Sequence, residues 1–259
     1  MFVKSKIAGK TGLVFILFLA IISVNAQTPD SSNKYHIFLE PYFFTPAMSG
    51  TADIGNLPNT FVCVPAADLL KNLKSGGMLY AELHNNRLAF TSDLVYAHLS
   101  QDATSKKEVI EGTADIKQFW WELEGLYRVN PWLETGLGVR FYNLTTGFNL
   151  TVSAPGGPAS RADQKTNIWI DPLIVTRLMK WVSNRWFLSL RADLGGFGIG
   201  SRLSWQLQPL VGYKASRLLQ LSLGYRVISM DYNNQKTSND KFLFDIEEYG
   251  PQIKIGFNL

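Results

Sequence analysis

Charged residues recur on one face of apolar segments, and they are the side chains of this chain best placed to do chemistry. In Leu133–Phe141, Glu134 and Arg140 alternate with large apolar residues. Because successive side chains of a strand point to opposite faces, these charges share the face that lacks the apolar residues. Inside a closed barrel, such charges would either pair and fill the interior or line a path that selects a small polar solute or ion. The set comprises eight acids, Glu40, Glu82, Asp93, Glu122, Glu124, Glu134, Asp171 and Asp193, and five bases, Arg140, Arg177, Arg191, Arg226 and Lys254.

Residues that would support catalysis or metal binding are few. His98 and Ser100 lie two residues apart in YAHLS, but no carboxylate that would orient the histidine is identifiable from the sequence. The chain has one cysteine, Cys63, and three histidines without the spacing of metal ligands. The glycine cluster Gly195–Gly200 lacks the Lys-Ser/Thr signature of a phosphate loop. We therefore expect no enzyme, no catalytic residue, no cofactor and no metal.

The N-terminal segment has the pattern of a cleaved export signal. Basic residues including Lys10 precede the apolar run Leu13–Val24, and Ala26 follows in a small-residue cleavage context. That run is shorter than the roughly 20 residues of a spanning helix. The sequence thus predicts a signal peptide at 1–26 and one barrel domain at 27–259. Loss of three lysines lowers the net charge from +4 to 22 − 21 = +1, which gives nucleic-acid binding little support.

The rest of the chain alternates apolar and polar residues with period two. No apolar run of 18 or more follows residue 26, so a membrane-bound mature chain must be a closed β-barrel. Short connectors alternate with long polar ones at about 100–112, 154–165 and 233–241, as in outer-membrane barrels. We expect an all-β, antiparallel transmembrane barrel of about ten strands: 35–46, 74–84, 88–99, 113–128, 132–152, 165–180, 185–196, 201–214, 218–232 and 242–259.

Two regions leave alternatives open. Residues 47–73 would hold an extra hairpin in a twelve-strand barrel, and an eight-strand barrel is the smaller alternative. Pro65–Lys74 has the composition of a short helix near residues 66–73, placed over or inside the barrel mouth. The glycine cluster Gly195–Gly200 is expected at a hairpin tip, where the backbone needs positive φ values.

The apolar face is expected to meet lipid rather than to fill the interior, as it would in a soluble barrel. Only 18% of residues are charged, and many charges lie in connectors. The opposite faces carry glycines and charges of both signs, as in a transmembrane barrel. Aromatic residues near the strand ends predict two interfacial girdles: Trp132, Trp186, Tyr127 and Tyr213 at one boundary, and Trp205, Tyr232 and Tyr249 at the other.

Two stretches carry a resemblance to known proteins. The terminal strand, with Ile253, Ile255, Phe257 and Leu259 on one face, resembles the C-terminal assembly signal of bacterial outer-membrane proteins. RADLGGFGIGSRLSWQLQPLVGY (191–213) and LGYRV (223–227), with EPYFFTPAMSG (40–50) and DLLKNLKSG (68–76), resemble an uncharacterised family of small bacterial outer-membrane β-barrel proteins of the outer-membrane protein A and X kind. The resemblance implies the bacterial outer membrane, periplasmic termini, extracellular long loops, outer-membrane lipid and the barrel-assembly machinery as partners; it implies no activity.

These observations favour a barrel with a narrow, charge-filled lumen and a structural or surface-interaction role. One alternative is a porin-like channel for a small polar solute, which twelve strands and unpaired lumen charges would favour. The other is a lipid-modifying enzyme at the outer rim, which a converging His, Ser and carboxylate on the lipid face would favour. The oligomeric state is not indicated by the sequence.

Overall fold

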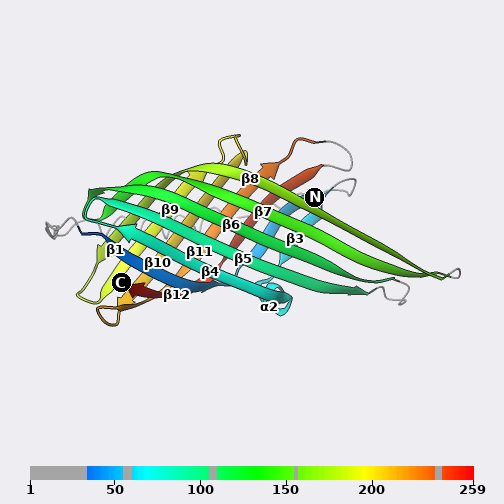
Figure 1. Ribbon diagram of the computed structural model, residues 1–259, viewed down its shortest axis with the longest axis horizontal. Coiled ribbons are helices and arrows are strands. Elements are labelled where there is room, and N and C mark those ends of the chain that lie inside the picture. The colour runs from blue at the N-terminus through cyan, green and yellow to red at the C-terminus, as the bar shows by residue number, and fades with distance from the viewer. Residues whose placement is uncertain (1–33, 55–59, 105–109, 155–156, 237–240) are drawn as a thin grey trace, which may run out of the picture. The chain divides into compact units, whose positions relative to one another are not determined.

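A computed structural model describes residues 34–259 except 55–59, 105–109, 155–156 and 237–240, so the predicted signal peptide lies outside the described residues. The described chain is almost entirely strand (Figure 1). Its elements are β1 His36–Phe44, β2 Ala47–Ile54, β3 Thr60–Val64, α2 Ala66–Lys71, β4 Leu73–His84, β5 Leu88–Thr104, β6 Ile110–Asn130, β7 Leu133–Ala154, β8 Gly157–Trp181, β9 Trp186–Gly195, β10 Leu203–Lys214, β11 Leu219–Asn233 and β12 Phe242–Asn258. No helix among these residues is long and apolar enough to cross a membrane.

The strands form one antiparallel sheet that closes on itself. Each strand from β4 to β12 pairs with the next, β1 pairs with β4, and β1 also pairs with β12 from Phe38↔Asn258 to Phe44↔Gln252. These ten strands form the barrel. β2 pairs with β12 beyond the point where the β1–β12 pairing ends, and β3 pairs with β2, so the sheet contains twelve strands. The prediction of an antiparallel barrel of about ten strands is confirmed, and the extra hairpin lies where the alternative placed it.

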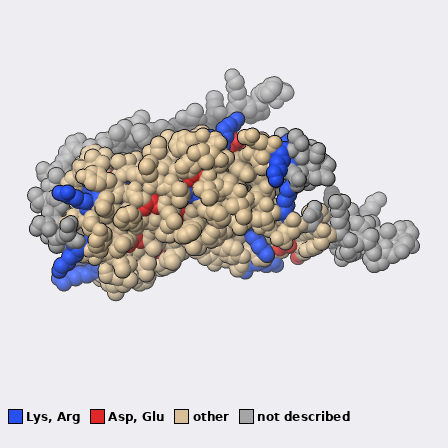
Figure 2. All heavy atoms as spheres, turned by 45° about the horizontal axis from the view of Figure 1, so that its top comes forward, with Lys and Arg blue, Asp and Glu red and all other residues tan. Residues whose placement is uncertain are grey.

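The alternation of residues along each strand places one set of side chains inside the barrel and the other set on its outer surface. On β6, Trp120, Glu122 and Glu124 are buried, while their neighbours Trp121 and Leu123 are exposed. The outer surface is therefore apolar while the buried acids point inward, which is the reverse of a soluble barrel and the arrangement of a transmembrane one. In Figure 2, Lys and Arg gather toward the two ends of the visible face, and the belt between them is mostly uncharged residues with a few Asp and Glu atoms visible.

The height of the outer apolar band matches a membrane. On β6 the outward residues are apolar or glycine from Val129 to Phe119, and the next outward residue is Lys117. Ten residues of strand tilted by about 40° rise about 25 Å, which is the height of the lipid-facing band of outer-membrane barrels. At the boundary of the band near Val129, Tyr127, Trp132 and Trp186 are exposed, as expected for an aromatic girdle.

The two ends of the barrel differ. One end, here called the turn end, carries the short connections at 85–87, 131–132, 182–185 and 215–218 and the C-terminus. At the other, the hairpin end, β5 to β8 are 17, 21, 22 and 25 residues long and project furthest (Figure 1), whereas β9 has 10 residues and β10 has 12.

The long polar connectors predicted at 100–112 and 154–165 are largely strand. β5 and β6 pair out to Thr104↔Glu111, and β7 and β8 pair out to Ala154↔Gly157. The prediction of loops was wrong because it rested on polarity. A hairpin that extends into water satisfies its backbone hydrogen bonds in the ladder and needs no apolar face.

The glycine cluster and the short helix lie as expected. Residues 196–202 form the β9–β10 tip, in which Gly196, Phe197 and Gly198 have φ of 87°, 50° and 77°. Only glycine adopts such values without strain, which explains the two glycines. α2 (Ala66–Lys71) begins after Pro65 in the segment where a helix was predicted.

We expect arginine to be rejected from the outer apolar band. Leu223 is 59% exposed in mid-strand, so Leu223→Arg should destabilise the folded barrel by about 2–4 kcal/mol. Leu218, 52% exposed in a turn, is the matched control, and Leu218→Arg should cost about 1 kcal/mol or less. Urea titration in lipid vesicles, read by gel migration before and after heating, measures both. Equal losses would contradict the assignment of the faces.

Candidate functional site

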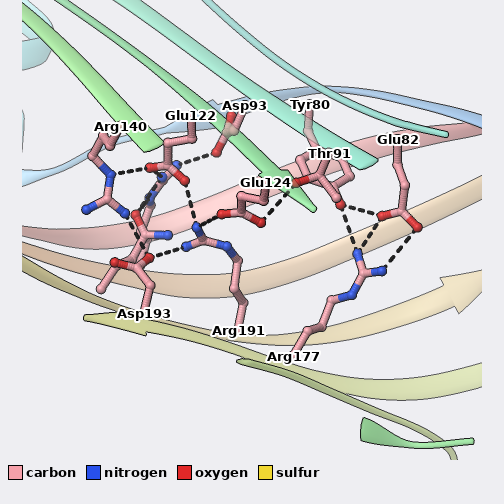
Figure 3. Close-up of polar contacts among 12 residues, drawn as sticks. Tyr80, Glu82, Thr91, Asp93, Glu122, Glu124, Arg140, Arg177, Arg191 and Asp193 are labelled. Carbon is pink, nitrogen blue, oxygen red and sulfur yellow. Dashed lines mark hydrogen bonds and ion pairs between the residues drawn. The ribbon is translucent and has the colours of Figure 1, made fainter. Parts of the chain in front are cut away.

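The centre of the lumen is built around one carboxylate, Glu122 on β6. Its Oε1 accepts hydrogen bonds from Arg140 Nε at 2.8 Å and Arg226 Nη2 at 3.1 Å, and its Oε2 accepts one from Arg191 Nη2 at 2.8 Å. The three arginines come from β7, β11 and β9. Inward positions of four strands thus meet at Glu122; Figure 3 shows Arg140 and Arg191 beside it.

Other acids complete this central cluster. Asp193 accepts from Arg140 at 2.8 Å and from Arg191 at 2.7 Å. Asp93 accepts from Arg226 at 3.1 Å and from the hydroxyl of Tyr42 at 2.7 Å. Glu124 pairs with Arg191 and accepts from Thr91. The central cluster therefore holds three arginines among four carboxylates, nearly all out of contact with water.

Two smaller groups lie beside the central cluster. Arg177 pairs with both Glu82 and Glu134, and Arg128 also donates to Glu134. Lys254 pairs with Glu40 at 3.2 Å, and its ammonium lies over the rings of Tyr42 at 4.6 Å and Tyr80 at 5.2 Å. Tyr80 also donates a hydrogen bond to Glu82 two residues along β4, and this contact links the two groups; Figure 3 shows Tyr80, Glu82 and Arg177.

Asp171 is the one residue of the predicted set that the structure places apart. Its carboxylate accepts the backbone N–H of Ser201 at 2.6 Å and the Ser201 hydroxyl at 2.8 Å. Gly196 N–H donates to Pro172 O nearby. Asp171 thus holds the β9–β10 tip against β8 instead of joining the ion pairs, while the other twelve residues of the set lie in the three groups.

The sequence analysis missed a second level of the interior that is apolar. Trp169 stacks on Tyr232 with ring centroids 4.2 Å apart and on Tyr142 at 4.7 Å, and Trp120 packs edge-on to Tyr142. The same buried cluster contains Phe44, Val95, Leu144, Ile228, Met230, Phe242, Phe244 and Ile246. Toward the hairpin end, the polar filling therefore gives way to aromatic filling.

The prediction that Tyr232 belongs to an outer girdle was wrong, because Tyr232 is even-numbered on β11 and points inward with Arg226 and Met230. The signal that would have found the apolar level is the run Phe119-Trp120-Trp121. Three successive aromatic residues in a strand place an aromatic side chain on each face.

Amides fill further inward positions. Gln206 Oε1 accepts from Arg226, and Gln208 Nε2 donates to Gln252 Oε1 at 2.9 Å. Gln206 Oε1 thus accepts from both Nε and Nη2 of Arg226, and all three amide side chains are buried.

The pair His98 and Ser100 does gain a carboxylate, Asp115 on β6. However, His98 Nε2 lies 3.2 Å from Asp115 Oδ1, and Ser100 also hydrogen-bonds to Asp115. Both side chains thus engage the same acid, whereas a serine nucleophile must contact its histidine base. Among the described residues no three His, Cys, Asp or Glu side chains are grouped to hold a metal.

Comparisons with known proteins find similarity in fold alone. No family model matches the chain, and no curated protein matches it. Solved structures with a similar fold include the outer-membrane protease OmpT from Escherichia coli, at 9% identity over 92% of this chain and 99% of that one, with a TM-score of 0.44. Ail, the attachment invasion locus protein of Yersinia pestis, is 8% identical over 88% of this chain and 100% of that one, TM-score 0.35. The P. putida toluene transporter TodX is 9% identical over 88% and 90%, TM-score 0.36.

The closed barrel, its apolar outer band and the charged residues of its interior are those of an integral bacterial outer-membrane protein, so its exterior lies in lipid.

We expect the central cluster to dominate stability. Glu122→Gln removes one charge from three buried arginines and should destabilise the barrel by about 3 kcal/mol or more. The control is Asp231→Asn, which removes the same charge from an ion pair with the exposed Arg202 and should cost about 1 kcal/mol or less. Urea titrations in vesicles compare the two variants. A smaller effect at Glu122 than at Asp231 would contradict the assignment of the cluster as structural.

Proposed function

We propose that the protein is a closed, non-conducting outer-membrane barrel that acts as a structural scaffold and presents the β5–β8 hairpins for interactions at the cell surface. The observation that carries the proposal is the filling of the lumen at two successive levels. Glu122, Arg140 and Arg226 are at most 1% exposed in the polar level, and Trp120 is 1% exposed in the aromatic level.

The pairing of the lumen charges favours this role over a channel. A conducting pore lined by charges needs side chains that water and ions reach. Here twelve of the thirteen predicted charges are in ion pairs, and the thirteenth, Asp171, is hydrogen-bonded to Ser201. A barrel of about ten strands is also narrow enough for its side chains to fill it.

The hairpin end supports the surface-interaction part of the proposal. Beyond Gln118, β6 is accessible on both faces, since Ile116 and Lys117 are both exposed. Outward side chains of β5 to β8 there surround a polar hollow of about 400 Å³, which includes His98, Asp115 and Lys117. Such a hairpin wall, accessible on both faces above the membrane, is suited to contact a polar partner.

The proposal includes three features that follow from export. The segment 1–26 is removed as a signal peptide, the turn end lies in the periplasm with both ends of the mature chain, and the β12 strand is recognised by the barrel-assembly machinery. Together these place the hairpin end outside the cell.

We expect the folded protein to be impermeable to ions. Vesicles carrying the refolded chain and a potassium gradient should leak no faster than protein-free vesicles, because ion pairs and aromatic rings fill the described interior at two levels. The folded fraction is measured on the same vesicles by heat-dependent gel migration. A leak proportional to folded protein would contradict closure and favour the channel.

We expect the hairpin end to face outward. In a Cys63→Ser background, which removes the exposed free thiol, Asn149→Cys should react with a membrane-impermeant maleimide on intact cells. Asn184→Cys, exposed in a short turn, should react only after lysis. The reverse pattern would place the turn end outside and overturn the surface role.

A further inference from the structure

The barrel wall has a seam between β1 and β4. The two strands pair from His36↔His84 to Pro41↔Leu79 and no further. Beyond that point β1 remains paired with β12, and β2 then pairs with the rest of β12. Among the described strands, β3 pairs with β2 alone. β4 continues to Leu73 paired with β5 alone, so no strand of the described residues lies beside its other edge there. The helix α2 connects β3 to β4 across this gap.

A cavity of about 150 Å³ occupies the seam. Its lining includes Phe43, Gly77 and Tyr96, which point outward, and Val95 and Trp120, which are buried in the interior. A cavity lined from both faces crosses the wall, so the sheet does not separate the interior from the lipid side here. An apolar cavity of this size holds a molecule as large as benzene.

The mouth of the cavity lies at the edge of the apolar band. Tyr96 pairs with Phe119, which is the last apolar outward residue of β6 before Lys117. Leu69 and Leu70 of α2 complete the apolar wall on the hairpin side. A molecule dissolved in the bilayer near this boundary therefore meets the cavity without crossing the polar surface.

The inner end of the cavity is polar. Glu248 is 2% exposed and lines the cavity together with Gln118, whose Nε2 donates to Glu248 Oε1 at 2.7 Å. Among the described residues Glu248 has no basic side chain within ion-pair distance, and the indole N–H of the buried Trp120 lacks a hydrogen-bond partner. Buried polar atoms without partners are costly, and a ligand hydroxyl would supply the missing bond.

We propose that this seam cavity binds a small apolar molecule, about the size of one aromatic ring and carrying an uncharged hydroxyl, that enters from the bilayer between β1 and β4. The ring occupies the space beside Gly77 and Val95. The hydroxyl faces Trp120 and Glu248. The site is separate from the ion pairs of the lumen, so it is compatible with a barrel that does not conduct.

The test uses 4-iodophenol, whose iodine quenches a nearby tryptophan, with the folded chain in phospholipid vesicles. We expect quenching that saturates, above the linear background from probe dissolved in lipid. Gly77→Phe should abolish the saturable part, because a Cβ at Gly77 meets no atom within 4 Å and the ring would fill the space. Gly125→Phe is the matched control: its Cβ would come no closer than 3.7 Å to another residue, at an outward position away from the seam, and saturation should persist.

Trp120→Phe removes the reporter and should also abolish the saturable quenching, while gel migration verifies that each variant is folded. Quenching that is linear in the wild type would overturn the proposal and would show that lipid chains already occupy the cavity. Saturation that survives Gly77→Phe or Trp120→Phe would also overturn it, because the bound probe would lie elsewhere.

The polar end is tested by removing the hydroxyl from the probe. With concentrations expressed per lipid, 4-iodophenol should bind about 2- to 10-fold more tightly than iodobenzene, the range expected for one hydrogen bond. Equal binding of the two probes would overturn the assignment of Trp120 and Glu248 to a ligand hydroxyl.

Discussion

The pairing of β1 with β12 is the contact on which the rest of the structure depends. In lipid, an open sheet would leave a row of unpaired backbone groups facing hydrocarbon, so the sheet has to close. Closure at ten strands then determines the width of the interior, and a barrel that narrow must be filled by its own side chains. The ion pairs around Glu122 and the aromatic stack around Trp169 are two solutions to the same filling problem at two heights.

The charged level around Glu122 and the aromatic level around Trp169 fill the interior at different energetic cost. The charges of Arg140 and Arg226 are withdrawn from water, and their attraction to Glu122, Asp93 and Asp193 must offset that penalty. Such pairs add less stability than their number suggests, but each is expensive to break. The aromatic level withdraws no charge from water, but the indole N–H groups of Trp120 and Trp169 and the hydroxyl of Tyr142 are buried there without hydrogen-bond partners. This level lies toward the hairpin end, where it keeps solvent from the ion pairs below.

Most of the fold follows from residue alternation, and the failures have identifiable physical reasons. Period two placed Glu122 and Arg140 inward without any knowledge of their partners, because the side of a strand is a local property. Which charge meets which depends on register between strands far apart in the chain, so the separate role of Asp171 was not visible. Polarity was a poor guide to the β5–β8 hairpins, since strands that leave the membrane are wet on both faces. The seam at β4 depends on where the pairing of β1 with β4 stops, which is a property of two strands together and not of the alternation within either one.

Closure also orders the folding of the chain in time. Neighbouring strands such as β6 and β7 are joined by short turns and can pair as soon as both exist, but β1 and β12 are separated by almost the whole barrel sequence. Long-range pairing of this kind is slow, because the entropy of a large loop is lost before any contact compensates for it. Until that step, β1 and β12 are edge strands whose unpaired backbone groups can pair with another chain. The half-finished sheet is thus the state most prone to aggregate, and the step that closes the wall is the one that removes this hazard.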